Sequence, residues 1–199
     1  EMCIRDSCSW GGQFRSQIAQ DLINYVTLDL GCLVIGAAGN EDTQTPHYPS
    51  GYDNVLSVGA TDQTDTKAWF SNYGYSVDLC APGVSIATTR YNNQYGTTDG
   101  TSFSCPITSG AAALVWAHKP ELSAIQVAEQ LRVSADVTMY TVNASAYKNK
   151  LGFGRLDVSR ALSLVSPSIK ASNARLVNSN GDPAEPGQSA NLAVDFMNL

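Results

Sequence analysis

A serine at the start of an apolar helix is the strongest chemical signal in the sequence. Ser102 lies in residues 99–106 (DGTSFSCP), and the apolar stretch of residues 110–118 (GAAALVWAH) follows it. At the N-terminus of a helix, backbone N–H groups and the helix dipole favour negative charge, such as the oxyanion that forms during acyl transfer. A serine in this position can instead cap the helix by accepting a backbone N–H. Ser102 is therefore a candidate nucleophile whose role depends on the rest of the chain.

The segments before Ser102 predict a helix and then a parallel sheet. Residues 14–30 are predicted to form a helix because their apolar side chains recur at helical spacing: Phe14, Ile18, Leu22, Ile23 and Val26. Residues 32–37 (CLVIGA) are wholly apolar, which is typical of a parallel strand covered on both faces. Further short strands are predicted at residues 55–60, 77–79 and 84–88, between turn residues.

The segments after Ser102 predict helices. Residues 110–118 form the first of them, with Pro106 placed where a first helical turn tolerates proline. Ser123 and Gln126 have the spacing of a capping box, which opens a second helix that ends near Val133. A third helix is predicted at residues 157–165. Strands followed by helices indicate an α/β fold.

Both ends of the chain depart from this pattern. Residues 1–8 (EMCIRDSC) show no periodicity, so we leave them unassigned, as residues that need not be native to the protein. After Ser166, helical spacing gives way to a turn cluster at residues 181–187 and then to alternating apolar residues. We therefore predict one domain at residues 9–165, and at residues 166–199 a linker and the beginning of a truncated β-sandwich domain.

The composition excludes several classes of protein. Of the 199 residues, 43% are hydrophobic and 15% are charged, as in packed globular proteins. The net charge of −6 has the wrong sign for a nucleic-acid-binding surface. Residues 100–118 carry no charged side chain, but Ser, Thr and Pro interrupt them, so they do not predict a membrane span. The five cysteines form no CxxC pair and are predicted to be mostly buried thiols. We expect a monomer.

Four motifs, in their order along the chain, resemble those of the subtilisin-like serine proteases, which form the subtilase family, peptidase S8. They are GAAGN at residues 36–40 followed by Tyr48-Pro49, APG at residues 81–83, GTSFSCP at residues 100–106, and GFG at residues 152–154 before Leu156-Asp157. The resemblance covers roughly residues 9–164. It implies a subtilisin-like three-layer α/β fold with a mostly parallel sheet that is incomplete at its N-terminus. Residues 180–199 resemble the start of the β-sandwich modules that are appended to secreted bacterial enzymes, so we expect a secreted, extracellular protein. The resemblance to subtilases also implies a serine endopeptidase that cleaves polypeptides.

The same resemblance implies roles for individual residues. Ser102 would be the nucleophile, and the Asn40 side chain and the Ser102 N–H would hold the oxyanion. The implied substrate-binding positions are Ser9, Trp10, Gly11, Ala37, Ala38, Gly39, Gly100 and Thr101. Small residues would line the specificity pocket, which receives the side chain on the N-terminal side of the scissile bond, and would admit a large side chain there. Glu41 at the rim of this pocket either selects a basic or polar side chain or is a solvated loop carboxylate.

The catalytic base is absent from the recognised motifs. In the subtilase family the triad runs Asp, His, Ser along the chain, so the first two members would precede Ser9. At 1.5 Å per residue, His118 lies about 24 Å along a helix from Ser102, and His47 is expected on the surface of a loop. We therefore expect a fragment that is inactive by itself. The alternative is a catalytically inactive subtilase-like domain that serves as a binding or structural module.

Other activities fit the sequence less well. An α/β-hydrolase would need G-x-S-x-G, whereas residues 100–104 are GTSFS, and a nucleotide-binding loop would need G-x-G-x-x-G. No cofactor is required for the implied chemistry. A structural Ca²⁺ is an open interpretation for Asp78 and the loop carbonyls around Ser50, Tyr52 and Val55, because some subtilases hold a cation there. The alternative for Asp78 is an aspartate in a turn.

Overall fold

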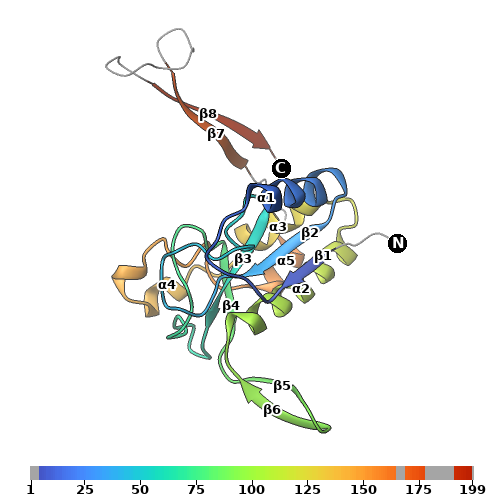
Figure 1. Ribbon diagram of the computed structural model, residues 1–199, viewed down its shortest axis with the longest axis vertical. Coiled ribbons are helices and arrows are strands. Elements are labelled where there is room, and N and C mark those ends of the chain that lie inside the picture. The colour runs from blue at the N-terminus through green and yellow to red at the C-terminus, as the bar shows by residue number, and fades with distance from the viewer. Residues whose placement is uncertain (1–4, 165–168, 178–190, 199) are drawn as a thin grey trace. The chain divides into compact units, whose positions relative to one another are not determined.

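Among the residues that the structure describes, four parallel strands form the central sheet. The computed structural model describes residues 5–164, 169–177 and 191–198. The strands lie in the order β1 (Arg5–Cys8), β2 (Leu33–Ala37), β3 (Val55–Thr61) and β4 (Leu79–Pro82) (Figure 1). Every residue of β2 and β3 is buried, which explains why these strands are almost wholly apolar. The predicted α/β fold with a parallel sheet is confirmed.

Helices cover both faces of this sheet and make three layers. The helices of one face are α2 (Thr101–His118), α3 (Ala124–Ser134) and α5 (Val158–Ser163), and those of the other are α1 (Gln17–Asn24) and the π-helical η1 (Tyr25–Asp29). Leu33 and Ile35 of β2 face the first group, and Val34 faces the second. Successive side chains of a strand point to opposite faces, so β2 contributes to both cores.

Shorter elements complete the chain. They are α4 (Met139–Val142), the 3-10 turn η2 (Ser145–Tyr147), the antiparallel hairpin of β5 (Ile86–Arg90) and β6 (Gln94–Thr98), and the antiparallel pair of β7 (Ile169–Val177) and β8 (Asn191–Asn198). Figure 1 shows the β5–β6 hairpin projecting from the body near β4. The chain divides into two compact units, residues 1–164 and 165–199. The β-sandwich stays a prediction, because the described part of the second unit consists of two strands.

The capping box of α3 is confirmed, and α5 also begins with a side-chain cap. In α3, the Ser123 hydroxyl accepts the Gln126 N–H at 3.3 Å, and the Gln126 side chain accepts the Ser123 N–H at 2.8 Å. Asp157 caps α5 by accepting the Arg160 N–H at 2.9 Å. These signals are local, because the cap and its partner lie within one turn.

The first helix differs from its prediction in its start and in its buried face. It begins at Gln17, with Ser16 as its N-cap, and not at residue 14. Three side chains that the spacing predicts to be buried are exposed: Phe14 (94%), Ile18 (82%) and Leu22 (60%). Ile23 and Val26 do pack against the sheet. Apolar side chains lie on more than one side of this helix, so their spacing alone does not show which side the sheet covers.

Helix α2 begins at Thr101, well before residue 110, and Pro106 therefore lies inside the helix and not in its first turn. Proline has no N–H, so the carbonyl of Ser102, four residues earlier, loses its helical donor. The Ser9 hydroxyl donates a hydrogen bond to that carbonyl at 2.9 Å. A donor from outside the helix thus compensates for the proline and ties Ser9 to the start of α2.

The structure also corrects the strand assignments. Residues 5–8, which sequence analysis leaves unassigned, form β1 and pair in parallel with β2. β1 has no apolar alternation, and its pairing is a long-range contact, so local spacing does not reveal it. β4 and β5 begin at residues 79 and 86, later than the predicted 77 and 84, and β6 has no counterpart in the prediction.

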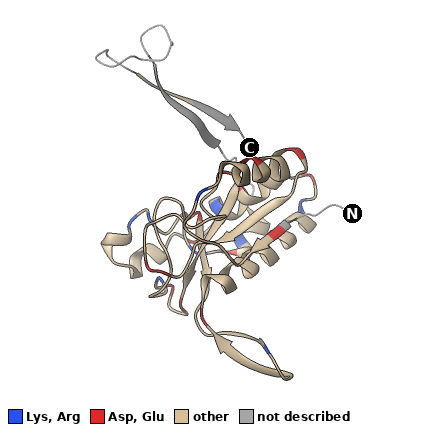
Figure 2. Ribbon diagram, viewed as in Figure 1, with Lys and Arg blue, Asp and Glu red and all other residues tan. Residues whose placement is uncertain are grey.

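Nucleic-acid and membrane partners place requirements on the distribution of charge and on the hydropathy of the helices. Figure 2 shows charged residues scattered over loops and helices, while β2 and β3 carry none. Within the described ranges, no helix has the length and hydropathy needed to cross a membrane.

Replacing Gly152 by alanine is expected to destabilise the first unit. Gly152 has φ +69°, and a Cβ there would lie 2.2 Å from the carbonyl carbon and oxygen of Asp78. Backbone strain alone costs about 1–3 kcal/mol, and the clash adds to it. We expect a loss of at least about 2 kcal/mol, which lowers Tm by roughly 4–8 °C.

The matched control is Gly110→Ala, at an exposed position of α2, where a Cβ meets no atom within 4 Å. It should stabilise the chain by about 0.5–1 kcal/mol, because alanine favours a helix interior. Thermal unfolding of both variants measures the difference. Equal Tm values would contradict the close approach of Gly152 to Asp78.

Candidate active site

Ser102 lies at the N-terminus of α2, beside the segment that follows β1. Its Oγ donates a hydrogen bond to the Ser9 carbonyl at 3.2 Å, and the Ser9 hydroxyl donates to the Ser102 carbonyl at 2.9 Å. Backbone N–H groups in the first turn of a helix have no intrahelical acceptor. The Ser102 side chain therefore lies beside backbone N–H groups of this kind. A nucleophile needs such donors next to it to stabilise an oxyanion.

Thr101 holds the side chain of Asn40 in one orientation. Asn40 Oδ1 accepts hydrogen bonds from the backbone N–H and from the hydroxyl of Thr101, each at 2.9 Å. A backbone N–H can only donate, so the amide oxygen must face Thr101, and the amide nitrogen then points away from it. Thr101 is fully buried. Its position favours a role in orienting Asn40 over direct contact with a substrate.

A hollow of about 200 Å³ brings most of the predicted site residues together. It is lined by Ser9, Trp10, Gly11, Ala37, Gly39, Asn40, Glu41, His47, Thr101 and Ser102. Ala38 and Gly100 are the predicted site residues outside this set. Ala38 packs into a core cluster with Val77, because successive residues of an extended chain point in opposite directions. Gly100 is buried, and its N–H donates to the Gly83 carbonyl at 2.8 Å.

His47 is the site residue that the sequence analysis misses. The sequence predicts a surface histidine, but the His47 side chain is only 12% exposed and lines the hollow. The neighbouring Tyr48 exchanges two backbone hydrogen bonds with Gly12, at 2.7 and 2.9 Å. This pairing carries the loop of His47 to the segment after β1. The two partners are distant in sequence, so no local signal predicts their contact.

Among the described residues, no side chain that could act as a general base accepts a hydrogen bond from the Ser102 hydroxyl. The acceptor of this hydroxyl is the Ser9 carbonyl, which cannot take up a proton at neutral pH. His118 ends the same helix that Ser102 begins. His47 has its Nδ1 3.8 Å from Glu41 Oε2, on the side of Glu41 and Gly39. If Ser102 acts as a nucleophile, its base comes from outside the described residues or from a rearrangement of His47.

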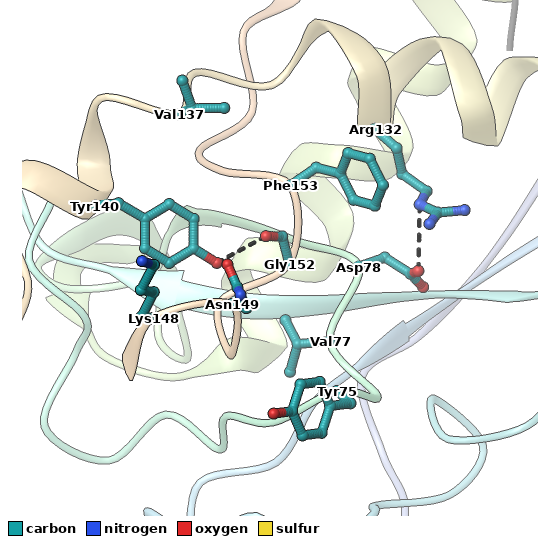
Figure 3. Close-up of a pocket in the computed structure, with 10 residues that line it drawn as sticks. All are labelled: Tyr75, Val77, Asp78, Arg132, Val137, Tyr140, Lys148, Asn149, Gly152 and Phe153. Atoms are coloured by element: carbon teal, nitrogen blue, oxygen red, sulfur yellow. Dashed lines mark hydrogen bonds and ion pairs between the residues drawn. The ribbon is translucent and has the colours of Figure 1, made fainter. Parts of the chain in front are cut away.

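The contacts of Asp78 do not fit a cation site. Asp78 Oδ2 accepts the Ser57 N–H at 2.8 Å, and Arg132 Nε lies 3.4 Å from Oδ1. Figure 3 shows this ion pair at one end of a second pocket, of about 640 Å³, where Arg132 also lies over the Phe153 ring at 4.4 Å. A guanidinium beside the carboxylate supplies the positive charge that a metal ion would bring. Within the described residues, no group of three or more His, Cys, Asp or Glu side chains could hold a metal ion.

Buried thiols do not compete with Ser102 as nucleophiles. The four cysteines of the described residues are Cys8, Cys32, Cys80 and Cys105, and all are buried, as predicted. Burial raises the pKa of Cys8 to about 11 and that of Cys80 to about 12. Burial also raises the pKa of Cys105, one turn along α2 from Ser102. At neutral pH these groups stay thiols, which are weak nucleophiles.

Comparison with known proteins identifies the family. The subtilase family, peptidase S8, matches residues 7–156, so this chain belongs to it and the resemblance seen in the sequence is confirmed. Subtilisin BL of Lederbergia lenta is 38% identical over 127 residues, which are 64% of this chain and 47% of that protein. The thermophilic serine proteinase of Bacillus sp. strain AK1 is 42% identical over 107 residues, which are 54% of this chain and 26% of that protein.

The similarity extends to three dimensions. The structure of a protease from Pseudoalteromonas arctica aligns with a TM-score of 0.73 at 25% identity, over 80% of this chain and 50% of that one. The chain thus spans about half, or less, of the length of these relatives.

Proposed function

We propose that this chain carries the nucleophile, an oxyanion donor and part of the substrate-binding surface of a secreted serine endopeptidase. The observation that carries the proposal is the hydrogen bond from the Thr101 N–H to Asn40 Oδ1, which turns the Asn40 amide nitrogen away from Thr101 in the hollow that Ser102 also lines. A serine hydroxyl beside a fixed amide donor suits acyl transfer. Membership of the subtilase family supports the same conclusion, as well as an extracellular location.

The proposed reaction begins with attack of Ser102 Oγ on the carbonyl of a peptide bond. A histidine base takes up the hydroxyl proton, and an aspartate orients that histidine. The carbonyl oxygen becomes an oxyanion, which accepts hydrogen bonds from the Asn40 amide nitrogen and the Ser102 N–H. Residues 9–11 pair with the substrate backbone as an added strand. The histidine and aspartate are supplied by residues outside those that the structure describes.

The domain organisation is part of this proposal. Residues 9–165, together with β1 at residues 5–8, would form the C-terminal portion of the catalytic domain, and residues 166–199 would form a linker and the start of a separate β domain. The division of the chain into compact units at residues 164 and 165 supports this boundary, as does the family match, which ends at residue 156.

An inactive subtilase-like domain is the second candidate function. It is favoured by the acceptor of the Ser102 hydroxyl, which is a backbone carbonyl and not a base. Such a domain would keep the hollow and bind a polypeptide without cleaving it.

Labelling with a fluorophosphonate probe tests the proposed function, because the probe reacts with activated serines. The 199-residue chain is expected to label slowly, since no described residue activates Ser102. A longer form of the protein that contributes an Asp and a His before Ser9 should label rapidly at Ser102. A folded longer form that does not label would support the inactive domain. Rapid labelling of the 199-residue chain would show that a group within it, with His47 the nearest candidate, activates the serine.

A further inference from the structure

The imidazole of His47 occupies the space between two backbone segments that line the hollow. A Cβ at Gly11 would lie 2.6 Å from His47 Nε2, and a Cβ at Gly39 would lie 3.0 Å from His47 Nδ1. The ring thus lies beside the segment after β1 and the segment after β2, where the Tyr48 carbonyl oxygen (2.1 Å from a Cβ at Gly11) and Asn72 Nδ2 (2.3 Å from a Cβ at Gly39) also lie close. The ring therefore fills the slot between residues 9–12 and 37–40.

The Nδ1 atom of the His47 ring is buried and, among the described residues, is not held by a hydrogen bond. The nearest carboxylate oxygen, Glu41 Oε2, lies 3.8 Å away, beyond hydrogen-bond distance, and is held by the Asn40 N–H and the Asn72 amide. A buried polar atom without a partner in a folded protein calls for an explanation. The position of the ring among the residues that line the hollow suggests that it is kept for its volume.

The size of the hollow limits what can enter it. Its volume of about 200 Å³ includes the space around Ser102 and Asn40, where the reacting carbonyl must lie. Only the remainder can receive the substrate side chain that precedes the scissile bond. That remainder is smaller than the whole hollow, because the imidazole occupies the slot between Gly11 and Gly39.

We propose that His47 determines specificity by closing the specificity pocket, so that the chain accepts small residues such as alanine or serine before the scissile bond and excludes phenylalanine, tyrosine and leucine. The proposal rests on the proposed function, because it assumes that the hollow receives a polypeptide. It replaces the expectation that small walls admit a large side chain, since the imidazole takes the space that those walls leave.

Peptide binding to the 199-residue chain tests this proposal without requiring catalysis. The probes are dye-labelled tetrapeptides with free carboxylates, Ala-Ala-Pro-Ala and Ala-Ala-Pro-Phe, and their affinities are measured by fluorescence anisotropy. The unaltered chain should bind the alanine peptide more tightly. In His47→Gly, the affinity for the phenylalanine peptide relative to the alanine peptide should rise by about 10-fold or more, as for a pocket that gains room for several carbons.

Two further variants keep the result interpretable. His118→Ala removes the other histidine, which is exposed on α2 and outside the hollow, and should leave the affinity ratio unchanged. His47→Asn shortens the side chain but keeps it polar, and should give an intermediate ratio. The backbone carbonyl of His47 accepts from the Ser50 hydroxyl and the Gly51 N–H, at 2.6 and 2.7 Å, and these contacts do not involve the ring. Circular dichroism verifies that each variant is folded.

Three outcomes would overturn the proposal. They are a preference of the unaltered chain for the phenylalanine peptide, an unchanged ratio in the folded His47 variants, and failure of every variant to bind either peptide. A ratio that changes as expected, combined with no labelling of Ser102 in the longer form, would uphold the role of His47 and reject the protease function. The two proposals can therefore fail separately.

Discussion

Ser102→Ala is expected to abolish peptide hydrolysis in the proposed longer form of the protein, which contributes an Asp and a His before Ser9. The substitution removes the attacking Oγ and leaves the oxyanion donors and the substrate-binding segments in place. The expected loss in kcat is about 10⁶-fold, a magnitude borrowed from subtilisin, itself a member of this family, and not calculated from this structure. Assays with a chromogenic tetrapeptide substrate measure kcat and KM for both forms.

Ser109→Ala is the matched control for this variant. Ser109 lies in the same helix, is buried, and donates its hydroxyl to the Cys105 carbonyl at 3.0 Å. It lies outside the hollow and should leave kcat unchanged. Hydrolysis that persists in Ser102→Ala would show that another nucleophile acts, and would remove Ser102 from the site.

Asn40→Ala is expected to lower kcat with little change in KM. In the transition state the substrate oxygen carries negative charge, so the Asn40 amide donates a stronger hydrogen bond to it than to the ground-state carbonyl. The expected loss of about 10²–10³ in kcat is again borrowed from subtilisin and not calculated from this structure. Kinetic constants and Tm measured on the same variant separate catalysis from stability.

The alternative role for Asn40 is structural, because its Oδ1 accepts two hydrogen bonds from Thr101. If that were its whole role, Asn40→Ala would lower Tm and leave kcat of the folded protein intact. Thr101→Val offers a companion variant, since it removes one of the two hydrogen bonds and keeps the Asn40 amide. A smaller loss in kcat than in Asn40→Ala is expected, because the Thr101 N–H still orients the amide oxygen.

Local patterns predicted the elements whose causes lie within a few residues. The capping box of Ser123 and Gln126 gave the correct start of α3, because both hydrogen bonds close within one helical turn. The apolar run of residues 32–37 predicted β2, because a strand covered on both faces needs apolar side chains throughout. The same patterns did not predict β1 or the buried face of α1. Both depend on which distant segments of the same chain pack against them.

The candidate site likewise has features that sequence motifs predicted and features that only the structure shows. Motif order alone marked Ser102 and Asn40 and placed most of the residues that line the hollow. The sequence could not show that Ser9 compensates for Pro106, or that Ala38 turns away into the core.

The sequence by itself determined the family, the α/β class and the motif positions of Ser102 and Asn40, because these depend on residue types at short spacing. Only the tertiary structure decided the orientation of the Asn40 amide and the position of His47. The first depends on a backbone N–H 61 residues away, that of Thr101. The second depends on the pairing of Tyr48 with Gly12, which places an imidazole between two glycines of separate segments. Contacts of this kind form when distant segments pack together, so the shape of the hollow is a property of the fold.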